Sequence, residues 1–441
     1  MNSTSEKIKI AIDINVVPGV IGGVVQSTMG LVQSLGQLDG PEKYSLITSV
    51  PQQVDWIKQY CGPNQQIVAK SKSKHYNGNG HHNGSALKKI FKPGLRVARE
   101  IVAKFLPQPS WPSVPMSDGF YESLGCDILH FPTQAFTLCA LPTIYNPHDL
   151  QHLHYPQFFT AAQLAERETI YPAACHFSHT IAVGSQWIKD DVVRQYRVNP
   201  DKVQIIPWAP PTMVYDEISD QQLEAAREKY QLPAEFAFYP AVTWPHKNHL
   251  RLFEAMAMLR DQRGIVVNLV CTGAKYESHW PKIEAAIRKL KLEKQVRFMG
   301  YLPEADLRAV YRLAQFLILP TLFEADSCPI HEAWTEGLAV ASANITALPD
   351  QVGDAGLLFD PKDVSAIADA LEKMSTDESL RDELRQRGFS RVKDFSWERT
   401  AKAFRAVYRR AAGQNLDEED RFLLSWDWMR EPRRQPEYVH A

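Results

Sequence analysis

The sequence predicts an α/β fold of two doubly wound domains that face each other across a cleft. Three observations lead to this prediction. The chain has 441 residues, more than one hydrophobic core usually supports. Short apolar runs alternate with helical patterns along its length, which is typical of βαβ units and parallel sheets. The alternation starts again after the proline-rich residues 205–218, which therefore mark a boundary.

In the first half of the chain, the expected strands are short apolar runs bounded by turn residues. A helix is expected at residues 24–38, where apolar residues recur at helical spacing. Residues 163–177 have a mixed pattern that fits either a helix or an irregular connection. The strands are expected at residues 8–14, 44–50, 126–132, 141–147, 179–185 and 202–208.

The second half repeats the same alternation. Strands are expected at residues 235–242, 264–273, 295–301, 314–321, 338–344 and 356–360. Helices are expected at residues 249–262, 280–292, 304–314, 329–337 and 364–375. We therefore place the domains at 1–208 and 209–395, followed by a C-terminal helix and tail at 396–441 that could pack back on the first domain.

The composition is that of a globular protein without a strong charge bias. Apolar residues make up 44% and charged residues 23%, and the net charge is −2, which gives no reason to expect a nucleic-acid partner. The six cysteines include no CxxC pair, so reduced thiols in a cytoplasmic protein are expected rather than disulfides or a metal site. No signal peptide or membrane span is expected from the apolar runs.

A basic segment at about residues 70–106 interrupts the alternation. It holds nine basic residues against a single acidic one, Glu100, together with apolar residues that could form one face. Two interpretations stay open. It could be a surface helix packed on its own domain, or it could contact an anionic acceptor or the inner surface of the membrane.

The stretch from Leu319 to Asn344 places two carboxylates around a strand-to-helix turn. Pro329 suits the first helical position, and the free N–H groups of a helix start favour an anion. Glu324 precedes this turn and Glu332 follows it, so each could accept hydrogen bonds from a polyol. Sugar, phosphates and ribose in that order make a nucleotide-sugar. Its phosphates would lie over Asp326, Ser327, Cys328, Pro329 and Ile330.

This region resembles the E-x7-E segment of retaining glycosyltransferases of the GT-B fold, in particular glycosyltransferase family 4 (group 1). Residues 241–262 resemble the family's lysine segment, with Lys247 as the lysine. Residues 179–211 are similar to its interdomain stretch, with Ser185 at the characteristic serine. Residues 148–150 resemble its His-Asp pair, and residues 21–35 its glycine-rich first loop. The matches run in order from about residue 10 to residue 410.

The resemblance implies two Rossmann-like domains, an N-terminal one that binds the acceptor and a C-terminal one that binds the donor. His148, Lys247 and Glu324 are the implied catalytic residues. The implied donor-binding residues are Gly22, Gly23, Ser185, His246, Lys247, Asn248, Asp326, Ser327, Cys328, Pro329, Ile330 and Glu332. The family also implies front-face attack with retention, and neither a metal nor a cofactor beyond the nucleotide-sugar.

Several positions depart from the family pattern. Ala241 stands where many relatives carry a second cation for the leaving diphosphate, and His246 could partly replace that charge. Asp326 adds a negative charge near the expected diphosphate. In the loop after His148, Asp149 could orient that histidine, and His152 and His154 could line the acceptor side.

We therefore expect a hexosyltransferase that uses a nucleoside-diphosphate-sugar, with GDP-mannose favoured over UDP-sugars, and a glycan or lipid-linked acceptor in cell-surface polysaccharide assembly. Its expected location is the cytoplasm, with possible peripheral contact with the membrane. Two alternatives stay open: another GT-B enzyme, such as a nucleotide-sugar epimerase or a phosphorylase, and a non-catalytic scaffold that binds nucleotide-sugars. A nicotinamide-binding enzyme is disfavoured because the first loop lacks GxGxxG spacing.

Overall fold

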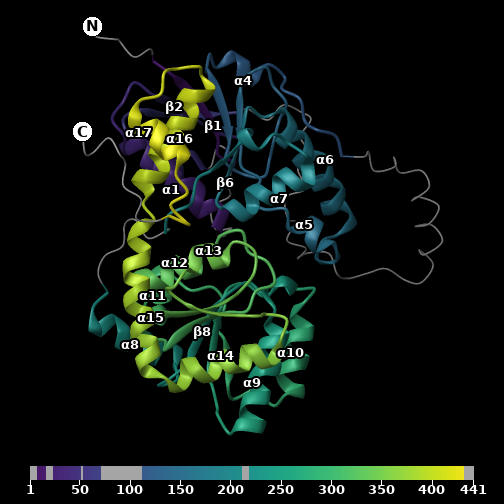
Figure 1. Cartoon of the computed structure of the whole chain (residues 1–441), viewed down its shortest axis with the longest axis vertical. Coiled ribbons are helices and arrows are strands. Elements are labelled where there is room, and N and C mark those ends of the chain that lie inside the picture. The colour runs from purple at the N-terminus through teal and green to yellow at the C-terminus, as the bar shows by residue number, and fades with distance from the viewer. Residues whose placement is uncertain (1–6, 16–22, 51–52, 71–111, 211–217, 432–441) are drawn as a thin grey trace, which may run out of the picture.

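The computed structural model of the chain describes residues 7–15, 23–50, 53–70, 112–210 and 218–431. These residues form two parallel sheets, one in each half of the chain, and the two halves lie one above the other (Figure 1). Gly22 and residues 71–106 of the basic segment lie outside the described residues.

The first sheet has seven strands in the order β3-β2-β1-β4-β5-β6-β7, and every pairing is parallel. The order reverses between β1 and β4, where the chain returns to the middle of the sheet. The strands are β1 (Lys9–Asp13), β2 (Lys43–Thr48), β3 (Gln65–Ala69), β4 (Ile128–Phe131), β5 (Thr143–Tyr145), β6 (Thr180–Val183) and β7 (Val203–Ile205). Apart from the partly exposed edge strand β3, these strands are mostly buried, as in a parallel sheet that is covered on both faces.

The second sheet has six parallel strands in the order β10-β9-β8-β11-β12-β13, with its reversal between β8 and β11. The strands are β8 (Ala237–Pro240), β9 (Leu269–Thr272), β10 (Val296–Phe298), β11 (Phe316–Leu319), β12 (Ala339–Ala343) and β13 (Leu357–Phe359). The first sheet ends before the predicted boundary at residue 208 and the second begins after it.

Helices alternate with the strands in both halves. In the first half they are α1 (Gly23–Gln37), α2 (Val54–Lys58), α4 (Phe120–Ser123), α5 (Gln151–His154), α6 (Ala161–Phe177) and α7 (Gln186–Tyr196). In the second half they are α8 (Asp220–Tyr230), α9 (His249–Arg263), α10 (Trp280–Lys289), α11 (Glu304–Leu313), α12 (Cys328–Thr335), α13 (Leu348–Val352), α14 (Val364–Thr376) and α15 (Glu378–Arg391). Two more follow, α16 (Trp397–Ala411) and α17 (Glu418–Ser425).

The structure adds β3, α8, α13 and α15 to the expected elements, and it changes three of those that were expected. The strand expected at 264–273 is only β9, because Gly264 caps α9 in the left-handed conformation (φ 70°) and the chain needs several residues to reach the sheet. Residues 163–177 belong to a regular helix, α6, which begins with a capping box at Thr160. Helix α12 begins at Cys328, one residue before the expected Pro329.

Helix α16 leaves the second half of the chain and packs on the first domain beside α1 and β2 (Figure 1). The approach is close: a Cβ added at Gly30 of α1 would come within 2.2 Å of the Trp397 ring. On the same helix the Tyr408 hydroxyl lies 2.8 Å from Nδ1 of His130, whose Nε2 lies 2.7 Å from the Asn146 amide oxygen. Burial lowers the pKa of His130 to about 4, so this buried link is between neutral groups.

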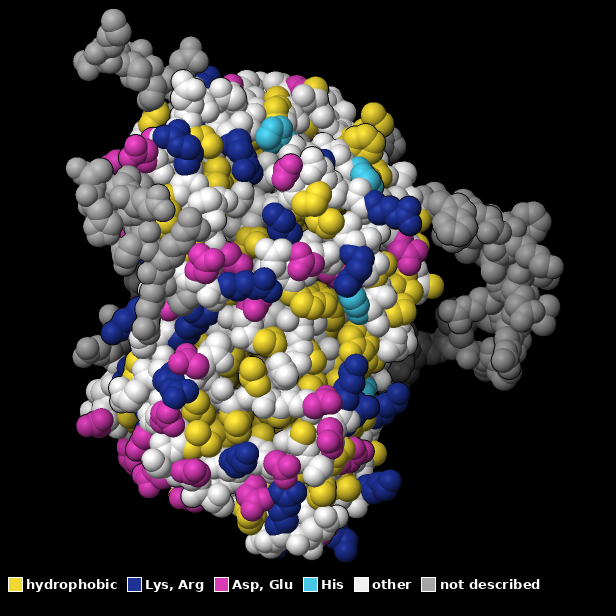
Figure 2. Space-filling model, in the orientation of Figure 1, with side chains coloured by type: hydrophobic (Ala, Val, Ile, Leu, Met, Phe, Trp, Pro, Cys, Tyr) yellow, Lys and Arg dark blue, Asp and Glu magenta, His cyan; other side chains and the backbone are white. Residues whose placement is uncertain are grey.

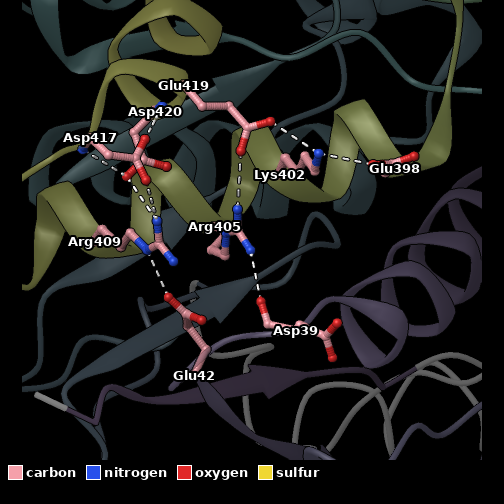
Figure 3. A network of polar contacts seen from close by, with 9 residues as sticks. All are labelled: Asp39, Glu42, Glu398, Lys402, Arg405, Arg409, Asp417, Glu419 and Asp420. Atoms are coloured by element: carbon pink, nitrogen blue, oxygen red, sulfur yellow. Dashed lines mark hydrogen bonds and ion pairs between the residues drawn. The ribbon is translucent and has the colours of Figure 1, made fainter. Parts of the chain in front are cut away.

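A network of ion pairs fixes α16 and α17 to the first domain (Figure 3). Arg409 donates to Glu42 at 2.7 Å and to Asp420 at 3.0 Å, and the side chains of these two acids are 3% and 1% exposed. Arg405 donates to the backbone carbonyl of Asp39, at the end of the first helix (3.1 Å). Lys402 binds Glu398 and Glu419 nearer the surface, so the buried part of the network depends on the two arginines.

The two domains also contact each other through aromatic side chains. Phe323 of the second domain contacts His154, Tyr155 and Trp187 of the first, with ring centroids 5.4, 6.2 and 5.7 Å away. The Phe158 ring lies 6.4 Å from that of His246. The loops after β8 and β11 are therefore held against the first domain.

On the face shown in Figure 2, basic and acidic side chains are interspersed over both domains, which agrees with the near-zero net charge. No helix within the described ranges is both long and apolar enough to cross a bilayer.

Lys70, the first residue of the basic segment, places its ammonium over the Phe120 and Tyr121 rings at 4.8 and 4.4 Å.

Replacing Arg409 with alanine should lower the free energy of unfolding by about 3 kcal/mol, because the carboxylates of Glu42 and Asp420 would stay buried without their cation. Urea denaturation followed by tryptophan fluorescence measures the change. Lys402→Ala is the matched control: it removes a cation from the exposed part of the same network and should cost at most about 1 kcal/mol. Equal losses of stability in the two variants would show that the buried ion pairs of Arg409 do not stabilise the packing of α16 on the first domain.

Candidate functional site

The topology brings two loops of the second domain together. Parallel strands β8 and β11 are neighbours, and the strand order reverses between them. Ligands of open α/β sheets bind beyond the carboxyl ends of the strands at such a reversal. The loop after β8 carries Lys247 and the loop after β11 carries Glu324, so the sheet places both side chains at this position.

Lys247 and Glu324 form an ion pair. Lys247 ends a short 3-10 turn (Pro245–Lys247), and Asn248 after it is left-handed, with φ 62°. The Asn248 amide donates to the carbonyls of Pro320 and Pro361, both at 2.8 Å, and so fastens this turn to the neighbouring loops. The Lys247 ammonium donates to the Glu324 carboxylate, and the two side chains are only 17% and 14% exposed.

The backbone of Glu324 is fixed by Thr346. The Thr346 hydroxyl donates to the Glu324 carbonyl and lies 3.3 Å from the Glu324 N–H. Thr346 has φ 49°, a strained conformation for a β-branched residue, and such strain is common at functional sites. Burial raises the pKa of the Glu324 carboxyl, and Lys247 opposes this rise.

Ser327, at the start of α12, is held by an amide from another element. Gln351 of α13 accepts from the Ser327 N–H and donates to its carbonyl, each at 3.0 Å. The Ser327 hydroxyl caps no helix N–H, although the residue occupies the cap position, and this buried oxygen has no partner among the described residues. The helix start is thus rigid and presents a free hydroxyl.

Asp326 also has an unpaired buried atom. Its Oδ1 is buried and makes no hydrogen bond within the described part of the chain. Burial raises the pKa of this carboxyl to about 7, and the nearby Glu324 carboxylate adds to the rise, while the Ser327 backbone amide opposes it. The folded protein therefore holds an acid that changes its charge near neutral pH.

Glu332 is bound by a residue of another helix. The Tyr311 hydroxyl of α11 donates to its carboxylate at 2.5 Å. Burial raises the pKa of Glu332, and Tyr311 opposes this rise. The tyrosine leaves the remaining lone pairs of the carboxylate available to another donor.

The first domain contributes the start of α1. A Cβ added at Gly23, the first residue of α1, would lie 3.5 Å from the Cys328 sulfur. The first turns of α1 and α12 therefore meet across the two domains. The Cys328 thiol stays protonated because burial raises its pKa. The charged groups that act on it are Asp326, Glu332, Glu324 and Lys247.

His148, after β5, is held in a left-handed conformation with φ 60°. Its Nε2 lies 2.8 Å from the Pro132 carbonyl, and its ring stacks on Trp208 with centroids 6.0 Å apart. Burial lowers the pKa of the imidazole, so the ring is neutral. Because a carbonyl can only accept, Nε2 carries the proton and Nδ1 is left as an acceptor.

Two predicted residues have other roles in this structure. Ser185 is buried and accepts from the Ile188 N–H at 3.3 Å, so its hydroxyl caps α7.

His246 cannot replace the cation missing at Ala241, because burial, helped by Lys247, lowers its pKa to about 2 and keeps it neutral. In the free protein His246 therefore supplies no positive charge. Pro329 and Ile330 occupy the first turn of α12.

The other residues of the His148 loop have structural contacts. Asp149 accepts from the Gln151 N–H at 2.9 Å and so holds the start of α5. His152 is buried, and its pKa is lowered to about 4 by burial, so it does not line an open surface. His154 lies 2.7 Å from the buried carboxylate of Asp191 and contacts Phe323 of the second domain.

Sequence reasoning missed Tyr311, Gln351 and Thr346, which hold Glu332, Ser327 and Glu324. Each comes from a different element of the second domain. Gln351 and Thr346 lie between β12 and β13, in a stretch that resembles the family but offers no motif that assigns a role to either residue. Tyr311 carried no signal, because a tyrosine on an amphipathic helix is usually a core residue.

Comparison with known proteins agrees with this arrangement. Residues 221–391 match the family described as glycosyl transferases group 1. The HepE protein of Anabaena, solved with UDP and glucose, superposes with a TM-score of 0.64 at 15% identity, over 91% of this chain and all of that chain. The chain has two Rossmann-like domains that face each other, and the candidate site lies between them at the carboxyl ends of the strands. This arrangement is a GT-B fold, as predicted.

Two curated relatives from Escherichia coli are similar in sequence. O-antigen chain mannosyltransferase B is 29% identical over 271 residues, which cover 58% of this chain and 70% of the relative. Serotype-specific mannosyltransferase WbdA is 27% identical over 290 residues, which cover 65% of this chain but only 34% of that longer protein. The family match and these relatives support the predicted family, the GT-B glycosyltransferases of group 1.

Asp326→Asn should stabilise the protein at about pH 8. The unfolded carboxyl ionises near 3.8 and the folded one at about 7, so between these values only the folded protein keeps the proton. Stability is therefore lost as the pH rises to about 7, and the loss is complete above it. Because the amide carries no charge at any pH, we expect this variant to raise the melting midpoint by roughly 2–4 °C at pH 8 and by less at pH 5.5.

Differential scanning fluorimetry at both pH values measures this change. Asp55→Asn, on the exposed start of α2, is the control and should leave the midpoint unchanged at either pH. A stabilisation by Asp326→Asn that does not grow with pH would show that burial does not shift this carboxyl.

Proposed function

We propose that this protein is a retaining hexosyltransferase that moves the sugar of a nucleoside-diphosphate-hexose to a hydroxyl of a glycan or a lipid-linked acceptor. GDP-mannose is the favoured donor, and the product belongs to a cell-surface polysaccharide. The reaction takes place on the cytoplasmic side, where nucleotide-sugars are available, and could involve peripheral contact with the membrane.

One observation carries the proposal: the helix starts of α1 and α12 meet beside the Lys247–Glu324 pair. The positive ends of the two helix dipoles favour an anion at such a point, and a lysine adds a full charge. A diphosphate fits between the two helix starts. Glu324 on one side and Glu332 on the other can then accept from sugar and ribose hydroxyls.

The relatives support the choice of donor and pathway. Both curated relatives are named mannosyltransferases, and one acts on the O-antigen chain. The HepE structure contains UDP and glucose, which agrees with a nucleotide-sugar as donor in this fold. We take mannose and a surface polysaccharide from the first pair, because they are nearer in sequence than HepE.

In the proposed reaction, charge develops on the leaving diphosphate and on the anomeric carbon. Lys247 and the positive end of the α12 dipole stabilise the leaving group, since both are fixed in place before the donor binds. Lys247 is paired with Glu324 in the free protein, so the donor enters between them: its phosphate binds the ammonium and its sugar binds the carboxylate. Neutral His148 accepts from a sugar hydroxyl through Nδ1.

We propose that protein groups alone neutralise the diphosphate, so that chelating agents leave the rate unchanged. We also propose front-face attack with retention, because Glu324, the carboxylate nearest the sugar, is engaged by the sugar hydroxyls in the bound state and is therefore not placed to attack the anomeric carbon. Proton NMR of the newly formed linkage tests retention: the α-donor should give an α-glycoside, and a β-product would overturn the proposed stereochemistry.

A panel of GDP-, UDP- and dTDP-hexoses tests the donor by thermal stabilisation and slow hydrolysis. GDP-mannose should stabilise the protein most. If donor incubated alone gave an epimer, or gave a sugar phosphate when phosphate was added, the epimerase or phosphorylase alternative would hold instead. Binding without turnover on any acceptor would favour the scaffold, and no binding of any nucleotide-sugar would sink the proposal.

Lys247→Ala should lower kcat about 10²–10³-fold, because it removes the full positive charge at the leaving diphosphate. Steady-state assays with saturating donor measure the loss. Lys294→Ala is the matched control, since Lys294 is exposed just before β10, at the opposite edge of the same sheet, and should keep the full rate. Unchanged transfer by the Lys247 variant would rule out this site.

Glu332→Gln should raise the Kd of the nucleoside diphosphate about tenfold, because a charged acceptor for the ribose is lost. Calorimetry with the parent nucleotide and with its 2′- and 3′-deoxy analogues locates the contact. The wild type should bind one deoxy analogue more weakly than the parent, while the Glu332 variant should bind the two alike.

Tyr311→Phe is the comparison for this experiment, because it keeps the Glu332 carboxylate and removes only the hydroxyl that orients it. It should weaken binding less than Glu332→Gln does. If the wild type bound all three nucleotides with equal affinity, Glu332 would not be the ribose contact.

A further inference from the structure

We propose that Asp326 binds the nucleotide-sugar as a carboxylic acid, donating its proton in a hydrogen bond to the donor, so that donor binding takes up one proton at this residue. The proposal rests on the proposed function and adds to it the protonation state and role of one side chain in the same site.

The geometry leaves a place for a ligand atom at this residue. Oδ1 of Asp326 is buried and has no partner among the described residues, and the same is true of the Ser327 hydroxyl beside it. Buried polar atoms nearly always have a hydrogen-bond partner, and each exception calls for an explanation. Two neighbouring exceptions at the start of α12, in the loop that carries Glu324, are explained by a ligand that supplies the missing partners.

The titratable groups around Asp326 come from four places in the fold. Glu324 lies in the same loop, and its carboxylate is paired with Lys247 from the loop after β8. Cys328 on α12 has a protonated thiol. From the first domain, Asp149 adds negative charge near Glu324. Residues 16–22, which precede Gly23, contain no ionisable side chain in their sequence.

No cation in the described part of the chain pairs with Asp326, because the nearby ammonium is bound to Glu324. The free protein already holds the pKa of Asp326 at about 7. The diphosphate of the donor would bring two further negative charges to the same helix start and disfavour the carboxylate form. The bound state therefore keeps the proton, and a neutral carboxylic acid has an O–H to donate where a carboxylate could only accept.

The coupling between proton uptake and donor binding predicts the direction in which the Kd changes with pH. Below about pH 7 the free protein already holds the proton, so the affinity for donor should not change with pH. Above pH 7 the free carboxyl ionises and binding must recover the proton, so the Kd should rise by up to about tenfold for each pH unit.

Calorimetric titration with a nucleoside-diphosphate-hexose from pH 6 to pH 8.5 tests the proposal, with GDP-mannose as the first probe. The diphosphate diester is suitable because it lacks the terminal phosphate ionisation near pH 6 that would itself depend on pH. At pH 8, titrations in two buffers of different ionisation enthalpy should show an uptake approaching one proton per donor bound.

Asp326→Asn is the decisive variant, because an amide has the shape of the carboxylic acid and also donates. It should bind the donor at pH 8.5 about as tightly as the wild type does at pH 6, with an affinity independent of pH. Glu332→Gln is the matched comparison, since its pKa is also raised. It should bind more weakly at every pH but keep the pH dependence of the wild type.

Three results would overturn the proposal: a wild-type Kd that is constant from pH 6 to pH 8.5, an Asp326→Asn variant that keeps the pH dependence, or a folded Asp326→Asn variant that binds no donor at any pH. Each leaves the proposed transferase activity in place. Failure of the wild type to bind any nucleotide-sugar at any pH would instead refute the proposed function, and this proposal with it.

Discussion

The packing of α16 along α1 is the constraint on which the site depends. Helix α16 belongs to the second half of the sequence, yet Trp397 packs against Gly30 of the first domain, and Phe404 and Tyr408 pack against His130 of the same domain. Gly30 allows the two helices to approach closely, and Arg409 is enclosed by acids from both sides of the contact. Because α16 cannot move away without exposing these groups, it fixes where the second domain lies relative to the first.

That constraint determines what meets in the cleft. Each sheet reverses its strand order at one point, and the loops that follow the strands there carry the polar residues. With the domains fixed, the starts of α1 and α12 face each other, and Phe323 contacts the first domain beside Glu324. The proposed transfer needs positive charge at the leaving phosphates and acceptors at the hydroxyls, and Lys247, Glu324 and Glu332 lie on these loops.

The site also contains three buried carboxyl groups, and ionising all of them together would cost free energy. Glu324, Asp326 and Glu332 are close together, and burial raises the pKa of all three. Lys247 compensates Glu324 and the Tyr311 hydroxyl compensates Glu332, whereas Asp326 has only the Ser327 backbone amide. The difference between them lies in their partners and not in their residue type, since all three are ordinary acids in the unfolded chain.

The sequence alone determined the two parallel sheets and the loops that carry the chemistry, because apolar periodicity and turn residues are local properties of the chain. Lys247, Glu324 and Glu332 were predicted as site residues in this way, helped by the ordered resemblance to a family, and their role stays a prediction. The strand expected from Gly264 shows the limit of this reasoning, because one left-handed glycine was enough to extend a connection. Side-chain partners depend on residues that are distant in the sequence.

Only the tertiary structure decided that Lys247 and Glu324 bind each other, that His246 is neutral, and that Tyr311, Gln351 and Thr346 hold the site. The reason is physical: hydrogen bonding and burial set the charge of a side chain, and both arise from atoms that folding brings together. Sequence therefore determined which residues reach the cleft, and folding decided the charge that each of them carries there.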